Sequence, residues 1–302
     1  AINLLCKKGF KITGADNFND YYDVNLKKKR NNILKKFKNF EFIKLDINNK
    51  NKLEKIFKKK KFDFVFHFAA QAGVRYSIDH PRKYIESNIM GFYNILENVK
   101  KYKIKRLFYA SSSSVYGENK NFPLKENEKI SPKNIYGLTK KIDEEIGLIF
   151  NKYYNVKLVG LRFFTIYGEW GRPDMMMIKF ISSYYKNKTF KLYNFGKHVR
   201  DFTYVGDAVK IMYLLLRNHK KLNNFDIFNI CSNNPINLKE IILFLKKNKI
   251  SPKIKKVTLQ KADILKTHGD NSKLLKFIKF NKFSNWKESV KKTIIWYQRN
   301  ML

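Results

Sequence analysis

Short apolar runs with strand character alternate with helical segments over the first half of this 302-residue chain. The run at 62–68 is rich in aromatic residues and valine, which favours a strand that is buried on both faces. Alternation of this kind predicts parallel strands joined by crossover helices. We expect strands at 10–16, 40–46, 62–68, 105–110 and 156–163, and helices at 26–37, 50–60 and 81–102.

The pattern predicts an α/β fold, a Rossmann-type doubly wound parallel sheet with a smaller C-terminal substrate-binding domain. The alternation becomes less regular after about residue 164, where insertions that bind a substrate are expected. We place the large domain at 1–165 and expect the chain to rejoin it at about 203–231. The smaller domain is then formed by 166–202 and 232–302.

Composition excludes several classes of protein. With 44% hydrophobic residues the chain can bury a substantial core, and no apolar run approaches the roughly 20 residues that a membrane helix needs. Cys6 and Cys231 are too far apart in sequence to suggest a disulfide framework or a thiolate metal site, so a reducing cytoplasm is expected. The histidines lack the spacing of a zinc site, and no metal is expected. They are His67, His80, His198, His219 and His268.

The charge balance is strongly basic, with 63 Lys and Arg against 25 Asp and Glu. A net charge of +38 raises the question of nucleic acid binding. The basic residues are spread through every segment and accompany abundant Asn, Ile, Phe and Tyr, a bias typical of AT-rich coding sequences. We therefore expect only nonspecific attraction to polyanions at low salt.

The segment Tyr136-Gly137-Leu138-Thr139-Lys140 follows a run of four serines at 111–114. A free phenol has a pKa of about 10 and is a poor base at neutral pH. On a helix, Lys140 lies one turn from Tyr136 on the same face, where its ammonium favours the phenolate. A serine hydroxyl can orient the reacting oxygen. The spacing predicts a base assembled from Tyr136, Lys140 and one of the serines.

Two acidic residues stand at the ends of the first two predicted strands. Asp16 occupies the position where a dinucleotide-binding fold places a carboxylate on the adenosine ribose. Asp46 ends the next strand and could receive the adenine amino group. A carboxylate at residue 16 favours NAD over NADP because it repels a 2′-phosphate, although the basic residues at 27–30 act against that preference.

The first nine residues have the pattern of the back half of a helix that ends at Gly9. A dinucleotide fold also needs a first strand and a glycine-rich turn that holds the pyrophosphate, and neither precedes this helix. The chain begins with Ala1 instead of Met. We expect a fragment that starts inside the helix after a phosphate loop, with weakened retention of a cofactor.

Five sequence blocks carry a resemblance to a known family. They lie at 69–77, 111–117, 161–168, 171–175 and 200–205. The chain resembles the extended short-chain dehydrogenase/reductase family over essentially its whole length, and within it the UDP-glucuronate 4-epimerases. The Tyr-x-x-x-Lys pair marks only the superfamily, whereas Gly-Arg-Pro-Asp-Met at 171–175, after Arg-Phe-Phe-Thr, is similar to the uronate enzymes.

The resemblance implies a reaction cycle. Tyr136 takes the proton of the sugar 4-hydroxyl while hydride passes from C4 to NAD, and hydride returns to the other face of the turned 4-keto ring. Lys140 is implied to hold the nicotinamide ribose, and Ser112, with Ser114 as the alternative, to hold the 4-oxygen. The implied NAD-binding residues are Asp16, Asp46, Ile47, Phe68, Ala69, Ala70, Asn88, Tyr136, Lys140 and Phe164.

The implied residues of the UDP-sugar site are Arg75, Ser112, Ser114, Thr165, Arg172, Arg200 and Asp263. The arginines also make chemical sense, because a UDP-uronate carries a diphosphate and a carboxylate that guanidinium groups bind bidentately. The resemblance further implies a homodimer made by the helices that begin near Pro81 and Asn134. The expected partners are a UDP-sugar and a second copy, with no specific nucleic acid and no membrane.

Three alternatives stay open. The chain could be a UDP-glucose/galactose 4-epimerase, or a UDP-glucuronate decarboxylase that loses CO2 from the same 4-keto acid. It could also be a catalytically inactive basic binding protein on the same scaffold. A 4,6-dehydratase is disfavoured because it needs an acid pair where Ser113 and Ser114 stand.

Overall fold

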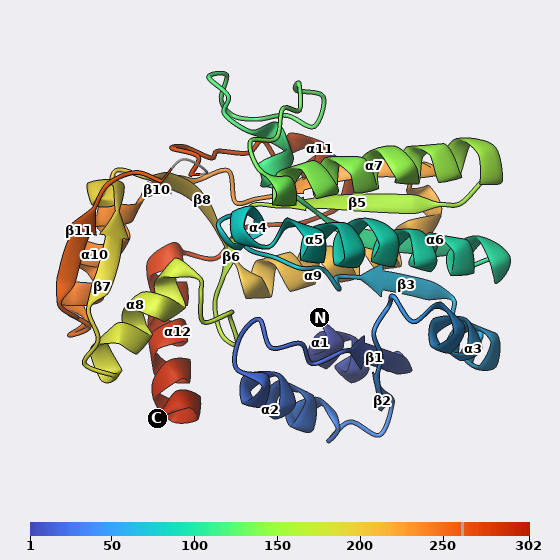
Figure 1. Ribbon diagram of the computed structural model, residues 1–302, viewed down its shortest axis with the longest axis horizontal. Helices are drawn as coiled ribbons and strands as arrows, with labels where there is room; N and C mark the ends of the chain where they lie inside the picture. The colour runs from blue at the N-terminus through green and yellow to red at the C-terminus, as the bar shows by residue number, and fades with distance from the viewer. Residues whose placement is uncertain (261–262) are drawn as a thin grey trace.

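The computed structural model describes residues 1–260 and 263–302. Its largest sheet contains four parallel strands in the order β3-β4-β5-β9 (Figure 1). These strands are β3 (Phe64–His67), β4 (Arg106–Ser112), β5 (Leu158–Phe163) and β9 (Phe225–Ile230). A separate parallel pair, β1 (Ile12–Asp16) and β2 (Phe40–Lys44), lies at the bottom of Figure 1.

Helices cover both faces of the four-stranded sheet. Leu107 and Tyr109 of β4 pack with α3 (Lys50–Lys60), α6 (Gly91–Lys101) and α7 (Ile135–Tyr154). Phe108, between them in sequence, points to the other face, because side chains alternate along a strand. There it packs with α9 (Val205–Arg217) and α11 (Ser272–Phe277). This arrangement confirms the predicted doubly wound α/β class.

The predicted elements of the first half are present, with small shifts at their ends. The opening helix is α1 (Ile2–Lys7), followed by Gly9 at φ +83°, and the basic helix is α2 (Val24–Leu34). The single helix expected at 81–102 is α5 (Pro81–Tyr84), a π-helical turn η1 (Ile85–Met90) and α6. α4 (Tyr76–Asp79) precedes it, and the 3-10 turn η2 (Ser113–Tyr116) follows β4.

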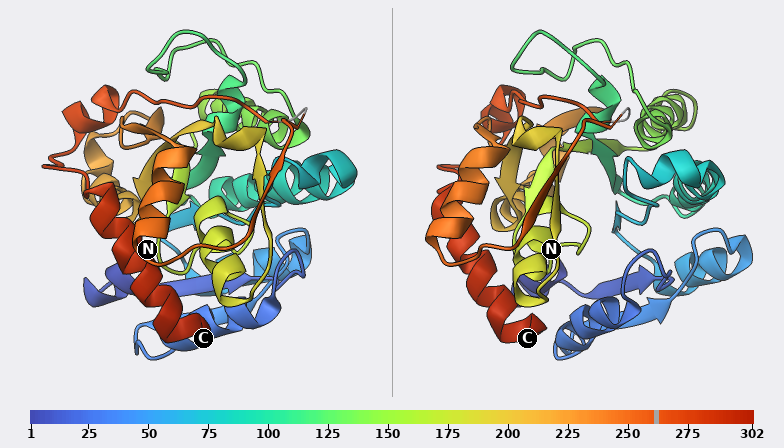
Figure 2. Two further views of the ribbon diagram at one scale, coloured as in Figure 1. Left: turned by 90° about the vertical axis from the view of Figure 1, so that its left-hand side faces the viewer. Right: turned by 60° about the vertical axis from the view of Figure 1, so that its left-hand side comes forward.

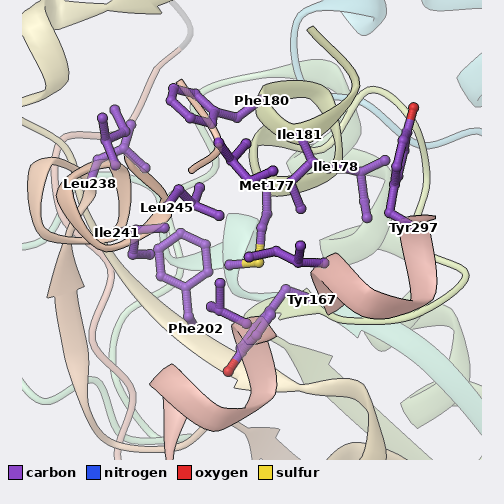
Figure 3. Packing of buried hydrophobic residues seen from close by; sticks show 14 of the residues in the cluster. Tyr167, Met177, Ile178, Phe180, Ile181, Phe202, Leu238, Ile241, Leu245 and Tyr297 are labelled. Atoms are coloured by element: carbon purple, nitrogen blue, oxygen red, sulfur yellow. The ribbon is translucent and has the colours of Figure 1, made fainter. Parts of the chain in front are cut away.

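A second hydrophobic core lies on the left of Figure 1 and is enlarged in Figure 3. Phe180 and Ile241 are fully buried in it, from α8 (Met176–Tyr185) and α10 (Leu238–Lys247). Figure 3 shows Tyr297 of α12 (Trp286–Met301) on the same cluster. Three short strands pair as β10-β8-β6 and two as β11-β7. The remaining elements are β6 (Thr165–Tyr167), β7 (Phe190–Tyr193), β8 (Val199–Tyr204), β10 (Pro235–Asn237), β11 (Ile254–Val257), η3 (Asn194–Gly196) and η4 (His219–Lys221).

The division of the chain at 165, 203 and 231 remains a proposal. Leu274 and Ile278, in and after α11, pack with the core of the large sheet. Among the described residues, no helix combines the length and the apolar character required to cross a bilayer.

The N-terminal turn of α7 lies against the serine segment after β4 because residue 137 has no side chain. A Cβ atom on Gly137 would lie 2.6 Å from the Ser114 carbonyl oxygen. The side chain of Asn134 caps the same turn by accepting a hydrogen bond of 2.8 Å from the Gly137 N–H. Gly137 therefore sets how closely Tyr136 approaches the serines.

We predict that Gly137→Ala destabilises the protein by roughly 1–3 kcal/mol, because the backbone of Ser114 has no room to move away from the added methyl group. Gly147→Ala on the same helix is the matched control, since its Cβ would make ordinary contacts of 3.5–3.6 Å. Alanine there should add roughly 0.5–1 kcal/mol of stability. Unfolding in urea measures the free energy of unfolding of both variants. Equal changes in that free energy would contradict the prediction.

Candidate active site

β4 and α7 bring the predicted catalytic hydroxyls to one place. Ser112 ends β4, and its buried Oγ accepts a hydrogen bond of 3.1 Å from the backbone N–H of Ser114. Tyr136 lies in the first turn of α7, which packs on the turn that holds the serines. Its half-buried ring meets Tyr84 edge-on at a centroid distance of 6.2 Å. Ser112, Ser114 and Tyr136 therefore share one site at the carboxyl end of the sheet.

Lys140 is buried beneath this site and has a partner that the sequence reading missed. Its Nζ donates a hydrogen bond of 3.0 Å to Oδ2 of Asp143, three residues further along α7. The side chains of Lys140 and Asp143 are only 2% and 1% exposed. The i, i+3 spacing of a lysine and an aspartate on a predicted helix was the signal that could have revealed this pair.

Asp16 and Asp46 lie close together at the carboxyl ends of β1 and β2. Asp16 accepts a hydrogen bond of 2.6 Å from the Phe18 N–H, and Lys27 Nζ lies 3.6 Å from its Oδ1. Asp46 accepts from the side chain of Asn17 at 3.1 Å. The Asp16 side chain is 46% exposed, so it is open to a ligand. The structure thus joins the two acidic residues that the sequence singled out.

The predicted cofactor residues at the end of β3 and after β2 are small or apolar. Phe68 follows β3 and is 40% exposed, with its ring edge-on to Phe163 at 5.9 Å. Ala69 is exposed and Ala70 half-buried in the loop after it. Ile47 accepts a hydrogen bond through its carbonyl from the side chain of Asn94 on α6. Small and aromatic side chains of this kind offer van der Waals contact to a flat ring.

Besides Lys140, two of the predicted cofactor residues, Asn88 and Phe164, have buried side chains. The fully buried side chain of Asn88 accepts a hydrogen bond of 2.7 Å from the backbone N–H of Gln71. It donates to the backbone carbonyl of Gln71 at 3.1 Å and to Thr139 Oγ1 at 2.9 Å. It therefore anchors the loop after β3 to α7. Phe164 packs in an apolar cluster with Tyr116 and Cys231. Both side chains support the site from beneath.

Arg172 lies in the segment between β6 and α8. Its guanidinium forms two hydrogen bonds of 3.0 Å with the carboxylate of Asp174, which also accepts a 3.3 Å bond from the Tyr21 hydroxyl. Burial disfavours the charge of Arg172, but attraction to Asp174 and then to Tyr136 and Tyr21 raises its pKa above the ordinary value. The cation therefore stays charged, and its guanidinium carbon lies 6.0 Å from the centre of the Tyr21 ring. Tyr21 carried no recognisable sequence signal.

The other predicted substrate residues form a second cluster. Arg75 forms bonds of 3.1 and 2.8 Å with both carboxylate oxygens of Asp263 and lies 3.6 Å from the centre of the Tyr193 ring. Nε2 of the buried His198 is 3.6 Å from the same carboxylate. Tyr193 and His198 were not foreseen, because only the fold brings the end of β7 and the residue before β8 to residue 75.

Arg200 belongs to this second cluster through its charge. Its guanidinium donates to the backbone carbonyls of Val199, Ile264 and Leu265. Burial lowers the pKa of Arg200 to about 10, with Asp263 opposing the shift. It remains a cation at neutral pH.

Thr165 opens β6, directly after Phe164, and is half-buried. It is thus joined to the sheet edge that holds the serines. Among residues 1–260 and 263–302, no three His, Cys, Asp or Glu side chains are grouped so that they could hold a metal ion.

Comparison with known proteins matches residues 1–231 to the model of the NAD dependent epimerase/dehydratase family. The chain is 40% identical over 293 residues to an uncharacterized protein of Methanocaldococcus jannaschii, covering 96% of this chain and 89% of that protein. It is 37% identical to the UDP-glucuronate 4-epimerase of Thermodesulfobacterium geofontis, covering 98% and 91%.

A solved structure gives the same picture of the fold. The UDP-glucuronic acid 4-epimerase of Bacillus cereus, in complex with UDP-glucuronic acid and NAD, superposes with a TM-score of 0.91 at 27% identity, covering 98% of this chain and 94% of the other. Because the family model matches residues 1–231 and the relatives match nearly the whole chain, the chain belongs to the NAD dependent epimerase/dehydratase family.

Proposed function

We propose that this protein is an NAD-dependent epimerase that inverts C4 of UDP-glucuronate and gives UDP-galacturonate. The observation that carries the proposal is that Arg172, the cation suited to a sugar carboxylate, lies 6.0 Å from the centre of the Tyr21 ring. A row of aromatic contacts, Tyr21 to Tyr76 to Tyr84, joins that ring to Tyr136. Relatives and solved structures named as UDP-glucuronate 4-epimerases support the choice of substrate. A guanidinium can bind the carboxylate of a uronate bidentately, and a neutral hexose offers it no such group.

The residues present fit a nicotinamide dinucleotide. Asp16 offers an exposed carboxylate to ribose hydroxyls, Asp46 lies beside it, and Phe68 offers an open apolar face. Lys140 and Tyr136 are implied to hold the nicotinamide end. When bound, NAD would supply the hydride acceptor and donor for C4 of the sugar.

The chain's own groups perform the proton transfer. The Tyr136 phenolate takes the proton of the 4-hydroxyl, and a buried cation on the same helix, Lys140, stabilises that phenolate. Ser112 donates to the 4-oxygen from the adjoining turn, with Ser114 as the second choice. After the 4-keto sugar has turned over, Tyr136 returns the proton to its 4-oxygen.

The two clusters of cations are proposed to bind different anionic groups of the substrate. Arg75 and Arg200, with Asp263 between them, are proposed to take the diphosphate and uridine end. Arg172 and Thr165 are proposed to take the carboxylate beside the reacting carbon. Holding the carboxylate by a guanidinium opposes loss of CO2 from the 4-keto acid, because decarboxylation disperses the charge that the guanidinium binds.

A direct test incubates the protein with NAD and UDP-glucuronate and separates the products. UDP-galacturonate is expected, and Tyr136→Phe should lower its rate of formation by at least about 100-fold through loss of the general base. Tyr153→Phe, at a 66% exposed position of the same helix, is the control and should keep full activity.

Other products select other functions. A UDP-pentose would identify a decarboxylase, and interconversion of UDP-glucose and UDP-galactose alone would identify a neutral-sugar epimerase. Salt-resistant binding of random DNA by a preparation that holds no nucleotide and turns over no sugar would identify a basic binding protein.

The carboxylate assignment has its own test. Arg172→Ala should lower kcat/KM for UDP-glucuronate by about 100-fold, since a charge-assisted bidentate contact contributes about 1.5–3 kcal/mol. Binding of UDP-galactose, which lacks the carboxylate, should weaken by less than about threefold by the same reasoning. The control is Arg82→Ala, whose side chain is 89% exposed. Unchanged turnover of UDP-glucuronate would refute the assignment.

We also propose a homodimer and a cytoplasmic location. α6 and α7 lie side by side at one edge of the molecule (Figures 1 and 2), and Tyr93 of α6 packs on Phe150 of α7. Large apolar side chains remain exposed along this edge: Ile85, Met90, Tyr93, Leu138, Leu148, Ile149 and Tyr153. A second copy would bury them in a four-helix packing.

The proposed cytoplasmic location rests on the two cysteines. The free thiols of Cys6 and Cys231 suit a reducing compartment.

Placing charges on this surface should separate the subunits. Tyr93→Glu combined with Ile149→Glu is expected to convert a species of twice the chain mass into one of single mass, because an acidic pair at a dimer axis is desolvated and repelled. Sedimentation velocity measures the change. Leu243→Glu on α10, at a position 60% exposed, is the control. Single mass for the unaltered protein would rule out the dimer.

A further inference from the structure

The buried partner of the catalytic lysine is a carboxylate. Lys140 Nζ and Asp143 Oδ2 are 3.0 Å apart, and both side chains are almost completely enclosed. No described residue donates to the second oxygen of Asp143, Oδ1, although this oxygen is buried as well. Lys140 is thus the hydrogen-bond donor that the structure gives to this carboxylate, and Asp143 is the anion closest to the ammonium.

The other titratable groups nearby leave this pairing intact. Glu144 of α7 is engaged by Arg162 of β5 at 2.8 and 2.9 Å. His67 of β3 is kept neutral, because burial and then the Lys140 charge lower its pKa to about 3. The buried hydroxyl of Tyr109 on β4 stays protonated, because burial and then Glu144 and Asp143 raise its pKa.

We propose that Asp143 is a positioning residue for catalysis, which shares the Lys140 ammonium with the Tyr136 phenolate and so limits how strongly that ammonium stabilises the base. The inference rests on the proposed function, in which Tyr136 removes the 4-hydroxyl proton. Lys140 lies one helical turn from both groups, at i+4 from Tyr136 and i−3 from Asp143, so one cation serves two anions.

The sign of the effect follows from electrostatics. A carboxylate beside Lys140 cancels part of its field at the Tyr136 oxygen, so removal of that carboxylate favours the phenolate. Burial raises the pKa of Asp143 to about 6, against the attraction of Lys140. Asp143 therefore weakens the field of Lys140 above about pH 6, and this effect fades as the pH falls through that value.

The test compares Asp143→Asn with Glu145→Gln, which removes an exposed carboxylate from the same helix. The ultraviolet band of the Tyr136 phenolate is titrated by difference against Tyr136→Phe in each background, because the chain contains 18 tyrosines. In Asp143→Asn the midpoint of this titration should fall by about one pH unit, and in Glu145→Gln the midpoint should stay unchanged. The acid limb of the kcat profile should move with it, giving up to about tenfold more activity on that limb above about pH 6, where Asp143 is charged in the wild type.

Two further variants separate charge from shape. Asp143→Glu restores the carboxylate and should return the titration toward the wild-type position. If Asp143→Asn does not fold, Asp143→Ser removes the same charge with a smaller side chain and carries the same expectation. A titration that is unchanged in a folded uncharged variant would overturn the proposal and leave Asp143 a structural partner of Lys140. A shifted titration without turnover of UDP-glucuronate would count against the proposed function alone.

Discussion

A buried ion pair fixes α7 to the large sheet, and the geometry of the site depends on it. Arg162 of β5 forms two hydrogen bonds with Glu144 of α7, and Ser111 of β4 donates to the same carboxylate. Removing one member of a buried pair typically costs about 3–5 kcal/mol, because the other charge is left without a partner. The second hydrogen-bonding arm of Arg162 reaches Tyr116 in the turn after the serines. One guanidinium therefore holds together the two segments that carry Ser112 and Tyr136.

Each cation assigned to catalysis or substrate binding, apart from Arg200, is held by an acidic side chain. Lys140 has Asp143, Arg172 has Asp174 and Arg75 has Asp263. A charge removed from water is costly unless it is paired, so these carboxylates allow the cations to be preorganised in a partly buried site. The net charge of +38 is thus of little importance to the chemistry, which depends on a few local pairs.

Most of the large domain could be predicted from the sequence, because its strands are short apolar runs separated by amphipathic helices. The bounds of α3 were predicted without error, whereas the π-helical turn η1 inside the helix after Pro81 has no periodic signature. Asp16, Asp46 and Tyr136 were proposed because each lies at a strand end or in a short local spacing, and Ser112 was chosen from the serine run by resemblance. Asn88 and Phe164 were assigned by resemblance alone, and only packing shows that their side chains are buried in the protein.

The sequence by itself determined the α/β class, the order of the elements and the local pair of Tyr136 and Lys140, because hydrophobic periodicity and helical spacing are properties of neighbouring residues. Only the tertiary structure decided which distant groups meet: Arg75 with Tyr193 and Asp263, and Tyr21 with Asp174. These contacts join segments up to 188 residues apart, and no pattern within one segment encodes them. The same holds for the burial that makes Asp143 the counter-charge of Lys140, since exposure is set by what the rest of the chain places over the helix.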